Sequence, residues 1–252
     1  MHPSISSSPL MNDDSCLHEH YAEIASTNDR LLDLARAGAG AGTLVSADYQ
    51  SAGRGRRGAA WIAPAGTAVL CSALFRPTLR LPAHHLAILT GVGVANGLRE
   101  AGFPVRIKWP NDLMLEERKV GGILIETVED AVVVGFGINC TVPAEAFPEE
   151  LRQRAGSLHL LSEAPVAREA IQRVVCQGLA EAFARVQAGS IISVLREWNT
   201  MNWLARRKVR VTGHMGAVEG NGLFLNGREM LFHVFKDCGV VPMPLSSSVE
   251  AR

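Results

Sequence analysis

Three arginines lie within four positions of one glycine-rich segment, GRGRRG at residues 53–58. Guanidinium groups this close repel one another unless an anion lies among them, and the glycines let backbone N–H groups approach that anion closely. The segment lacks the Lys-Ser/Thr ending of a Walker A loop, and its glycine spacing does not open a Rossmann helix. We interpret it as an anion-binding loop of another kind; a solvated loop or an RNA-contacting Gly-Arg tract is the alternative.

Three further segments carry residues that could contribute to such a site: KWPND at 108–112, RKVGGI at 118–123 and GFGIN at 135–139. Pro-Asn-Asp by itself is an ordinary turn, and a lysine at the mouth of a hairpin is usually solvated. Glycines inside a strand, however, leave room for a ligand or for another backbone. Each segment is therefore compatible with a binding site as well as with a purely structural role.

Predicted helices and strands alternate around these segments. A helix is predicted to begin near residues 26–28, where residue types that commonly cap helices precede apolar residues at helical spacing. Gly38 is predicted to end this helix. Small and apolar residues recur at helical spacing from 84 to 101. Apolar runs of strand length occupy 43–50 and 66–75, and we expect the second run in the middle of a sheet.

In the second half of the chain, the predicted secondary structure changes once, from mixed helices and strands to strands alone. Between 113 and 140, three apolar segments separated by charged residues are typical of an antiparallel meander. The longest predicted helix spans 166–186, and a short one follows at 191–198. Only short strand-like runs between glycines come after it, which predicts a domain boundary near residue 195 and a small all-β part behind it.

Composition excludes several classes of protein. The chain has 252 residues with 25 Lys and Arg against 25 Asp and Glu, whereas a protein that coats nucleic acid normally has a basic excess. The hydrophobic fraction of 47% excludes general disorder, and no apolar run approaches the roughly 18 residues of a membrane helix. The five cysteines form no C-x-x-C pair, and the N-terminal residues lack the regions of a secretory signal. We therefore expect a cytoplasmic protein with reduced thiols and no membrane partner.

Each segment is a weak signal by itself, but the order and spacing of the segments together resemble those of a known family. Ser-Thr-Asn at 26–28 is followed by YQSAGRGRRG from residue 49, by Trp61, and then by the KWPND, RKVGGI and GFGIN segments. In this order the sequence closely resembles the biotin protein ligases, specifically the biotin–[acetyl-CoA-carboxylase] ligases, over about residues 18–195. About 20 residues precede the matching part, which indicates the monofunctional type without an N-terminal DNA-binding domain, and hence no DNA partner.

The resemblance implies an α+β fold of the class II aminoacyl-tRNA-synthetase-like, biotin/lipoate ligase type. Such a fold has a mixed sheet with helices, followed by a small SH3-like all-β domain. We thus expect a disordered leader at 1–17, a catalytic domain at 18–195 and a C-terminal β domain at 196–252. The C-terminal pattern is atypical, because GHMGAVEGNGLFLNG is compressed and a Gly-Ile-Asp turn before Gly-x-Leu is absent.

The activity that the resemblance implies has two steps. Biotin and ATP react to biotinyl-5'-AMP and pyrophosphate, and the biotinyl group then passes to one lysine of a biotin carboxyl carrier protein of acetyl-CoA carboxylase or a related carboxylase. The first step brings a carboxylate against a phosphate, so cations must be placed in advance. Mg²⁺ is expected with ATP, without assigned ligands, and a homodimer is compatible with the resemblance.

Position by position, the resemblance assigns catalysis to Lys119 and Arg56. It assigns biotin binding to residues of four segments, namely Ser26, Thr27, Asn28, Gln50, Arg54, Gly55, Arg56, Lys119, Gly121 and Gly122. It assigns ATP and adenylate binding to Arg56, Arg57, Trp61, Asn111, Asp112 and Asn139. In this scheme Gly121 and Gly122 leave space for the biotin ring and valeryl chain, while Trp61 stacks near the adenine.

Two alternatives stay open at this point. A lipoate-type ligase shares the fold and the adenylation step, although the polar side chains of Ser26, Thr27 and Gln50 favour a ureido head group over a dithiolane. A ligase-like protein that binds biotin without turnover is the other alternative, because the C-terminal pattern departs from that of the family.

Overall fold

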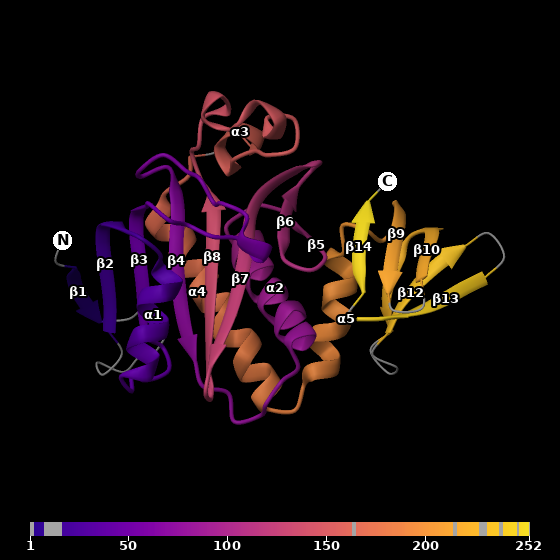
Figure 1. Ribbon diagram of the computed structural model, residues 1–252, viewed down its shortest axis with the longest axis horizontal. Coiled ribbons are helices and arrows are strands. Elements are labelled where there is room, and N and C mark those ends of the chain that lie inside the picture. Colours follow the sequence, from indigo (N-terminus) through magenta and orange to yellow (C-terminus); the bar gives the residue numbers. More distant parts are fainter. Residues whose placement is uncertain are drawn as a thin grey trace.

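A large mixed sheet with helices on both faces forms the body of the molecule, and a smaller strand-rich part lies beside it (Figure 1). The computed structural model describes residues 3–7, 17–162, 165–213, 216–226, 231–236, 239–245 and 247–251. In this described part, no helix is long and apolar enough to cross a membrane. The α+β class expected from the sequence is confirmed.

The large sheet has eight strands in the order β1-β2-β3-β4-β8-β7-β6-β5. Its strands are β1 Ser4–Ser7, β2 Leu17–Ile24, β3 Leu44–Gln50, β4 Ala68–Phe75, β5 Arg106–Lys108, β6 Asp112–Leu115, β7 Arg118–Val128 and β8 Ala131–Asn139. Only β2 and β3 pair in parallel; the other neighbours are antiparallel. All residues of β4 are buried, as expected for a central strand, and β6, β7 and β8 form the predicted meander.

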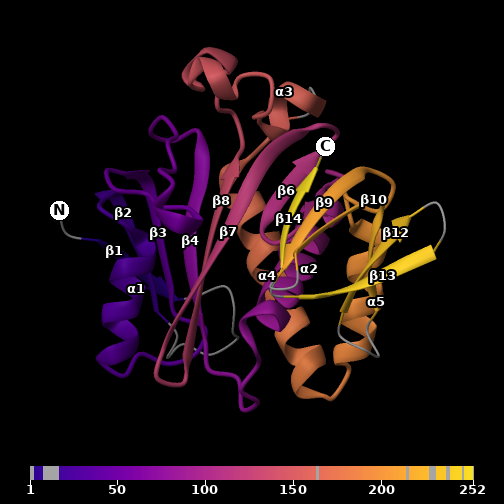
Figure 2. The ribbon, with the colours of Figure 1, turned by 45° about the vertical axis from the view of Figure 1, so that its right-hand side comes forward.

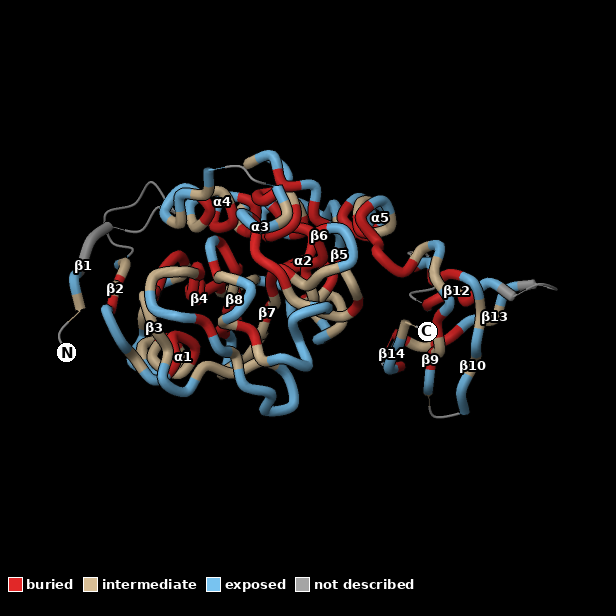
Figure 3. The backbone as a smooth tube through the Cα atoms, turned by 90° about the horizontal axis from the view of Figure 1, so that it is seen from above, coloured by how far each residue is buried: buried red, intermediate tan, exposed pale blue. Residues whose placement is uncertain are grey.

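Helices α2 and α4 cover one face of this sheet, and α1 lies on the other (Figure 3). The helices are α1 Thr27–Arg36, α2 Ala83–Glu100, α3 Leu158–Ser162, α4 Arg168–Gln187 and α5 Ile191–Met201, with short 3₁₀ turns at Arg56–Gly58, Ala144–Ala146 and Glu149–Leu151. Side chains on a strand alternate between the two faces. In β4, Val69, Cys71 and Ala73 therefore join the core under α2 and α4, whereas Ser72 faces α1.

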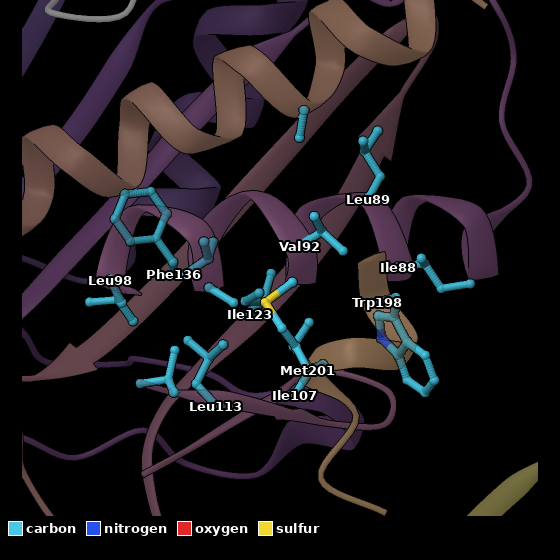
Figure 4. Close-up of a cluster of buried hydrophobic side chains, with 14 of the residues drawn as sticks. Ile88, Leu89, Val92, Leu98, Ile107, Leu113, Ile123, Phe136, Trp198 and Met201 are labelled. Atoms are coloured by element: carbon cyan, nitrogen blue, oxygen red, sulfur yellow. The ribbon is translucent and has the colours of Figure 1, made fainter. Parts of the chain in front are cut away.

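Glycines bring α2 and α4 into close contact. A Cβ atom at Gly97 would lie 2.2 Å from the carbonyl oxygen of Val174, and one at Gly178 would lie 2.3 Å from that of Gly93. Any side chain at these positions would push the helices apart. Large apolar side chains fill the space between α2, the strands and α5, as the close-up in Figure 4 shows for Val92, Ile107 and Met201.

The two ends of the large part differ from the expectation. Strand β1, Ser4–Ser7, pairs with β2 where a disordered leader was expected; residues 8–16 of that leader lie outside the described residues. The expected boundary at residue 195 falls inside α5, which continues to Met201. Residues Val194, Leu195 and Trp198 are buried, so packing carries this helix past the point where the apolar pattern alone placed its end.

The C-terminal part consists of two three-stranded sheets, in the orders β10-β9-β14 and β11-β12-β13 (Figure 2). The strands are β9 Lys208–Gly213, β10 Gly216–Asn221, β11 Leu223–Asn226, β12 Leu231–Lys236, β13 Gly239–Pro244 and β14 Ser248–Ala251. Helix α5 holds this part through Asn199, whose side chain accepts from the backbone of Leu225 at 2.9 Å and donates to it at 2.8 Å. The prediction of a small C-terminal β domain is confirmed.

An aromatic cluster of Trp109, Trp198 and Phe232 joins the two parts, with ring centroids 4.9 to 6.2 Å apart. Phe232 is fully buried. Phe232→Ala is expected to lower the free energy of unfolding by about 3–5 kcal/mol, because it leaves a cavity among large side chains. Phe224→Ala, on the neighbouring strand but 43% exposed, should cost less than about 0.5 kcal/mol. Urea unfolding of both variants checks this; equal losses would contradict it.

Candidate functional site

Three glycines hollow out the face of the large sheet on which α1 lies. Gly122 of β7 pairs with Gly137 of β8, and Leu124 pairs with Gly135 one step along the strands. A Cβ at Gly135 would lie 2.1 Å from Asn28 Oδ1, and one at Gly137 would lie 2.6 Å from the Trp61 ring. The absent side chains thus make room for Asn28 and Trp61.

Gly121 does not contribute to this hollow. Its Cβ would lie 2.8 Å from Ile138 Cδ1 and 3.0 Å from Leu113 Cδ1, which belong to the core beneath the other face. The assignment of Gly121 to the biotin site was therefore wrong about which face it serves. Two consecutive strand residues point to opposite faces, so only Gly122 of the pair faces the site.

The start of α1 closes one side of the hollow. Ser26 caps the helix, since its hydroxyl accepts from the backbone N–H of Asp29 at 3.3 Å. The next residue, Thr27, donates its backbone N–H to Gln50 Oε1 at 2.8 Å, and its hydroxyl lies 3.0 Å from the same atom. Helix α1 and strand β3 are thereby tied together at the site.

Trp61 lies on the floor of the hollow, after the arginine-rich loop. A Cβ at Gly122 would be 3.3 Å from its ring, and its indole nitrogen is buried without a hydrogen-bond partner among the described residues. The ring occupies space that the sequence scheme gave to the biotin ring and valeryl chain. Trp61 therefore borders that space.

Arg54 differs from the other cations of the loop because two carboxylates neutralise it. Its guanidinium donates to both carboxylate oxygens of Asp29 at 2.5 Å, and its Nη2 lies 3.5 Å from Glu126 Oε1. The hydrogen bonds from Arg54 lower the pKa of Asp29, although burial opposes this shift. Arg54 thus fastens the loop to α1 and β7 and is not a free anion-binding charge.

Lys119 and Arg56 supply the positive charge at the other end of the hollow. Lys119 Nζ lies 2.6 Å from Asp112 Oδ1 and 5.8 Å from the centroid of the Trp61 ring. Burial and the neighbouring Arg57 lower the pKa of Arg56, which Asp112 partly offsets. Among the described residues no carboxylate forms an ion pair with Arg56, so its guanidinium is available to an anion.

These groups line one cavity of about 220 Å³. The predicted site residues that line it are Ser26, Thr27, Asn28, Gln50, Arg54, Gly55, Arg56, Trp61, Asn111, Asp112, Lys119 and Gly122. A second cavity of about 620 Å³ adjoins it, shares Arg56, Asn111 and Ile123 with it, and reaches to the start of β14. Arg57 lines this second cavity instead of the first.

Asn139 does not line either cavity. It is 5% exposed, and its amide nitrogen donates to the carbonyl oxygen of Gly156 at 3.0 Å. Its position supports the segment next to β7, where the backbone N–H of Lys119 donates to the carbonyl of Arg154 at 2.7 Å. The structure therefore gives Asn139 a contact that holds the neighbouring loop, not the predicted contact with the nucleotide side.

Sequence reasoning missed Asp29, Ser72 and Glu126, which hold the site residues in place. Two of them left a signal. Ser72 is a lone polar residue amid the apolar run of β4, and Glu126 follows Gly122 and Leu124 at every second position of one strand. Alternation along β7 could have placed Glu126 on the face of the site.

Comparison with known proteins agrees with this geometry. The model of the biotin/lipoate A/B protein ligase family matches residues 21–142. The bifunctional ligase/repressor BirA of Bacillus subtilis is 40% identical over 142 residues, covering 54% of this chain and 44% of that protein. The biotin–[acetyl-CoA-carboxylase] ligase of Mycobacterium tuberculosis is 36% identical over 179 residues, covering 66% and 62%. The chain spans about half the length of the curated relatives it matches.

Among solved structures, the biotin protein ligase of Aquifex aeolicus in complex with biotin and ATP superposes with a TM-score of 0.82 at 25% identity. The match covers 93% of this chain and 99% of that one, so it extends over the C-terminal β part as well. The arginine-rich loop, the KWPND turn and the glycines of β7 and β8 all lie within the range matched by the family model. Residues 21–142 thus resemble the biotin/lipoate A/B protein ligase family, and the relatives named above are a bifunctional ligase/repressor, a biotin–[acetyl-CoA-carboxylase] ligase and a biotin protein ligase.

Proposed function

We propose that the protein is an ATP-dependent biotin protein ligase. It forms biotinyl-5'-AMP from biotin and ATP and transfers the biotinyl group to a lysine of a biotin carboxyl carrier protein. One observation carries the proposal: a single cavity presents the neutral amide of Asn28 beside Gly135 and the cation of Lys119 beside Gly122. That order fits a ligand with a neutral polar head and a carboxylate at its far end.

The polar end suits a ureido ring. Thr27 and Gln50 offer a hydroxyl and an amide, both uncharged, and the start of α1 and the end of β3 place them side by side. A dithiolane offers no N–H or carbonyl group to such partners, so the hydrogen-bonding capacity that Thr27 and Gln50 keep toward the cavity would go unused, at a cost of about 1–3 kcal/mol for each group buried in this way. The lipoate-type alternative is not favoured for this reason.

The cationic end suits adenylation. A biotin carboxylate oxygen attacks the α-phosphorus of ATP, a new P–O bond forms, and the bond to the β-phosphate bridging oxygen breaks with release of pyrophosphate. Lys119, which Asp112 holds in place before the reaction, and Arg56, which lines both cavities, would stabilise the negative charge that gathers on the phosphate. In the second step a lysine amine of the carrier attacks the activated carbonyl, and AMP leaves.

The adjoining cavity of about 620 Å³ is the proposed place of the nucleotide, with Arg56 and Asn111 at the junction and Arg57 within it. Asp112 is the one acidic side chain among the residues that line the first cavity. Mg²⁺ is usually bound through one or two carboxylates together with substrate phosphates, so Asp112 fits such an ion. Bound there, Mg²⁺ would neutralise phosphate charge.

Exchange of labelled pyrophosphate into ATP tests the proposal. Biotin should support exchange by the purified protein, lipoate should not, and a biotin carrier domain incubated with biotin and ATP should become detectable on an avidin blot. Exchange with lipoate alone would indicate a lipoate-type ligase, and biotin binding without exchange would indicate a protein that has lost turnover. Light scattering of the same sample tests whether the protein forms the homodimer with which the resemblance is compatible.

A further inference from the structure

A connected set of buried polar side chains lies beneath the neutral end of the cavity. Ser72 is fully buried in the middle of β4, and its Oγ lies 2.6 Å from Asn28 Oδ1 and 2.8 Å from Thr27 Oγ1. Thr27 and Asn28 are themselves 4% exposed. The direction of each hydrogen bond matters here, because a buried donor or acceptor without a partner lowers the free energy of unfolding.

The orientation of the Asn28 amide is fixed at its far side. Its Nδ2 lies 2.7 Å from Glu126 Oε2 and 3.4 Å from the carbonyl oxygen of Leu124, which can only accept. Glu126 in turn lies beside Arg54, which keeps a positive charge next to its carboxylate. Because the amide nitrogen faces these acceptors, the amide oxygen faces Ser72.

Ser72 has one hydroxyl proton for two neighbouring oxygens. Asn28 Oδ1 can only accept, so Ser72 donates to it. The 2.8 Å contact between Ser72 and Thr27 is then favourable only if the Thr27 hydroxyl donates to Ser72 Oγ. Gln50 Oε1 receives the backbone N–H of Thr27 at 2.8 Å and could also accept the Thr27 hydroxyl at 3.0 Å. A Thr27 proton directed there would leave the oxygens of Thr27 and Ser72 2.8 Å apart with only lone pairs between them.

We propose that Ser72 is a positioning residue that sets the direction of this hydrogen-bond chain. With its proton directed at Ser72, Thr27 Oγ1 presents only lone pairs to the cavity and accepts from an N–H group of the ligand. The inference rests on the proposed function, because the N–H donors in question are those of the ureido ring of biotin. This chain of hydrogen bonds therefore favours ligands whose head group carries N–H donors.

Direct binding without ATP tests this role on the full chain. The probes are biotin and the two cyclic carbamate analogues of biotin, in each of which one ureido N–H is replaced by a ring oxygen. The unsubstituted protein should bind one carbamate about tenfold or more weakly than biotin, because two lone pairs then face each other at Thr27. In Ser72→Ala the Thr27 hydroxyl is free to turn, so biotin should bind about tenfold more weakly and the preference over that carbamate should fall below about threefold.

Ser46→Ala is the matched control. Ser46 lies on the neighbouring strand β3, is 1% exposed, and contacts His18 at 2.7 Å and His20 at 2.9 Å on the opposite face of the sheet. The same substitution there should leave the preference between biotin and the carbamates unchanged. If Ser72→Ala does not fold by circular dichroism, Thr27→Val removes the directed hydroxyl itself and should lose the same preference.

The possible outcomes distinguish a failure of the proposed function from a failure of the role of Ser72. Absence of biotin binding by the unsubstituted protein would overturn the proposed function. Biotin binding with an unchanged preference in Ser72→Ala, or in Thr27→Val where that variant is the one that folds, would overturn the role of Ser72 and leave the function standing. Equal affinity of the unsubstituted protein for biotin and both carbamates would also overturn it, since no ligand N–H would then be read.

Discussion

Lys119→Ala is expected to slow biotin-dependent pyrophosphate exchange by roughly 100-fold or more, the usual scale for the loss of one preorganised charged donor. Lys119 lies between Asp112 and the Trp61 ring, where the proposed reaction brings two anions together. Truncation removes this cation and also leaves the Asp112 carboxylate unpaired beside the incoming phosphate. The loss should therefore persist at saturating biotin and ATP, whereas biotin affinity measured without ATP should change by less than about tenfold.

Lys108→Ala provides the control for that experiment. Lys108 also lies over an indole ring, 5.3 Å from the centroid of Trp203, but it lines neither cavity. Exchange by this variant should stay within about twofold of the unsubstituted protein. If Lys119→Ala exchanged pyrophosphate as fast as Lys108→Ala, the proposed role of Lys119 in adenylation would be refuted.

Local sequence patterns predicted most of the elements correctly, because the features that determine those elements are close together in the chain. The cap at Ser26, the apolar run of β4 and the alternating segments of β6 to β8 each contain their own signal. The end of α5 has no such signal. Trp198 and Met201 extend that helix by packing against parts of the chain that lie far away in the sequence.

The same distinction between local signals and long-range contacts applies to the site. Most of the residues assigned from the ordered motifs line one cavity, but a motif does not state which face of a strand a residue serves or which charges cancel. Gly121 was misplaced for the first reason. Arg54 was assigned to substrate binding, yet the carboxylates of Asp29 and Glu126 neutralise its charge. Neither carboxylate belongs to the motifs on which the resemblance rests. Pairings across 25 and 72 positions of the chain are visible only once the sheet is formed.

Gly135→Ala is expected to weaken biotin binding by roughly 100-fold, the scale at which a shift of about 1 Å disrupts a positioned site. A methyl group at this position would lie 2.1 Å from Asn28 Oδ1 and 2.9 Å from its Cγ, so the buried amide must move. Movement of Asn28 separates it from Ser72 and Glu126 and shifts the start of α1, where Thr27 lies. Overpacking of this kind should also cost about 1–3 kcal/mol of folding free energy.

Two further variants separate the steric effect from the polar one. Gly40→Ala, where a Cβ would meet no atom within 4 Å, should alter neither affinity nor stability measurably. Asn28→Ala added to Gly135→Ala removes the clashing amide, so it should recover the free energy of unfolding lost to overpacking, less about 1–3 kcal/mol because Ser72 and Glu126 lose their partner. Biotin affinity should stay low in that double variant, because the hydrogen-bond chain from Glu126 to Thr27 remains broken. Full recovery of affinity would show that Gly135 serves only to avoid a clash and that the polar chain contributes nothing to binding.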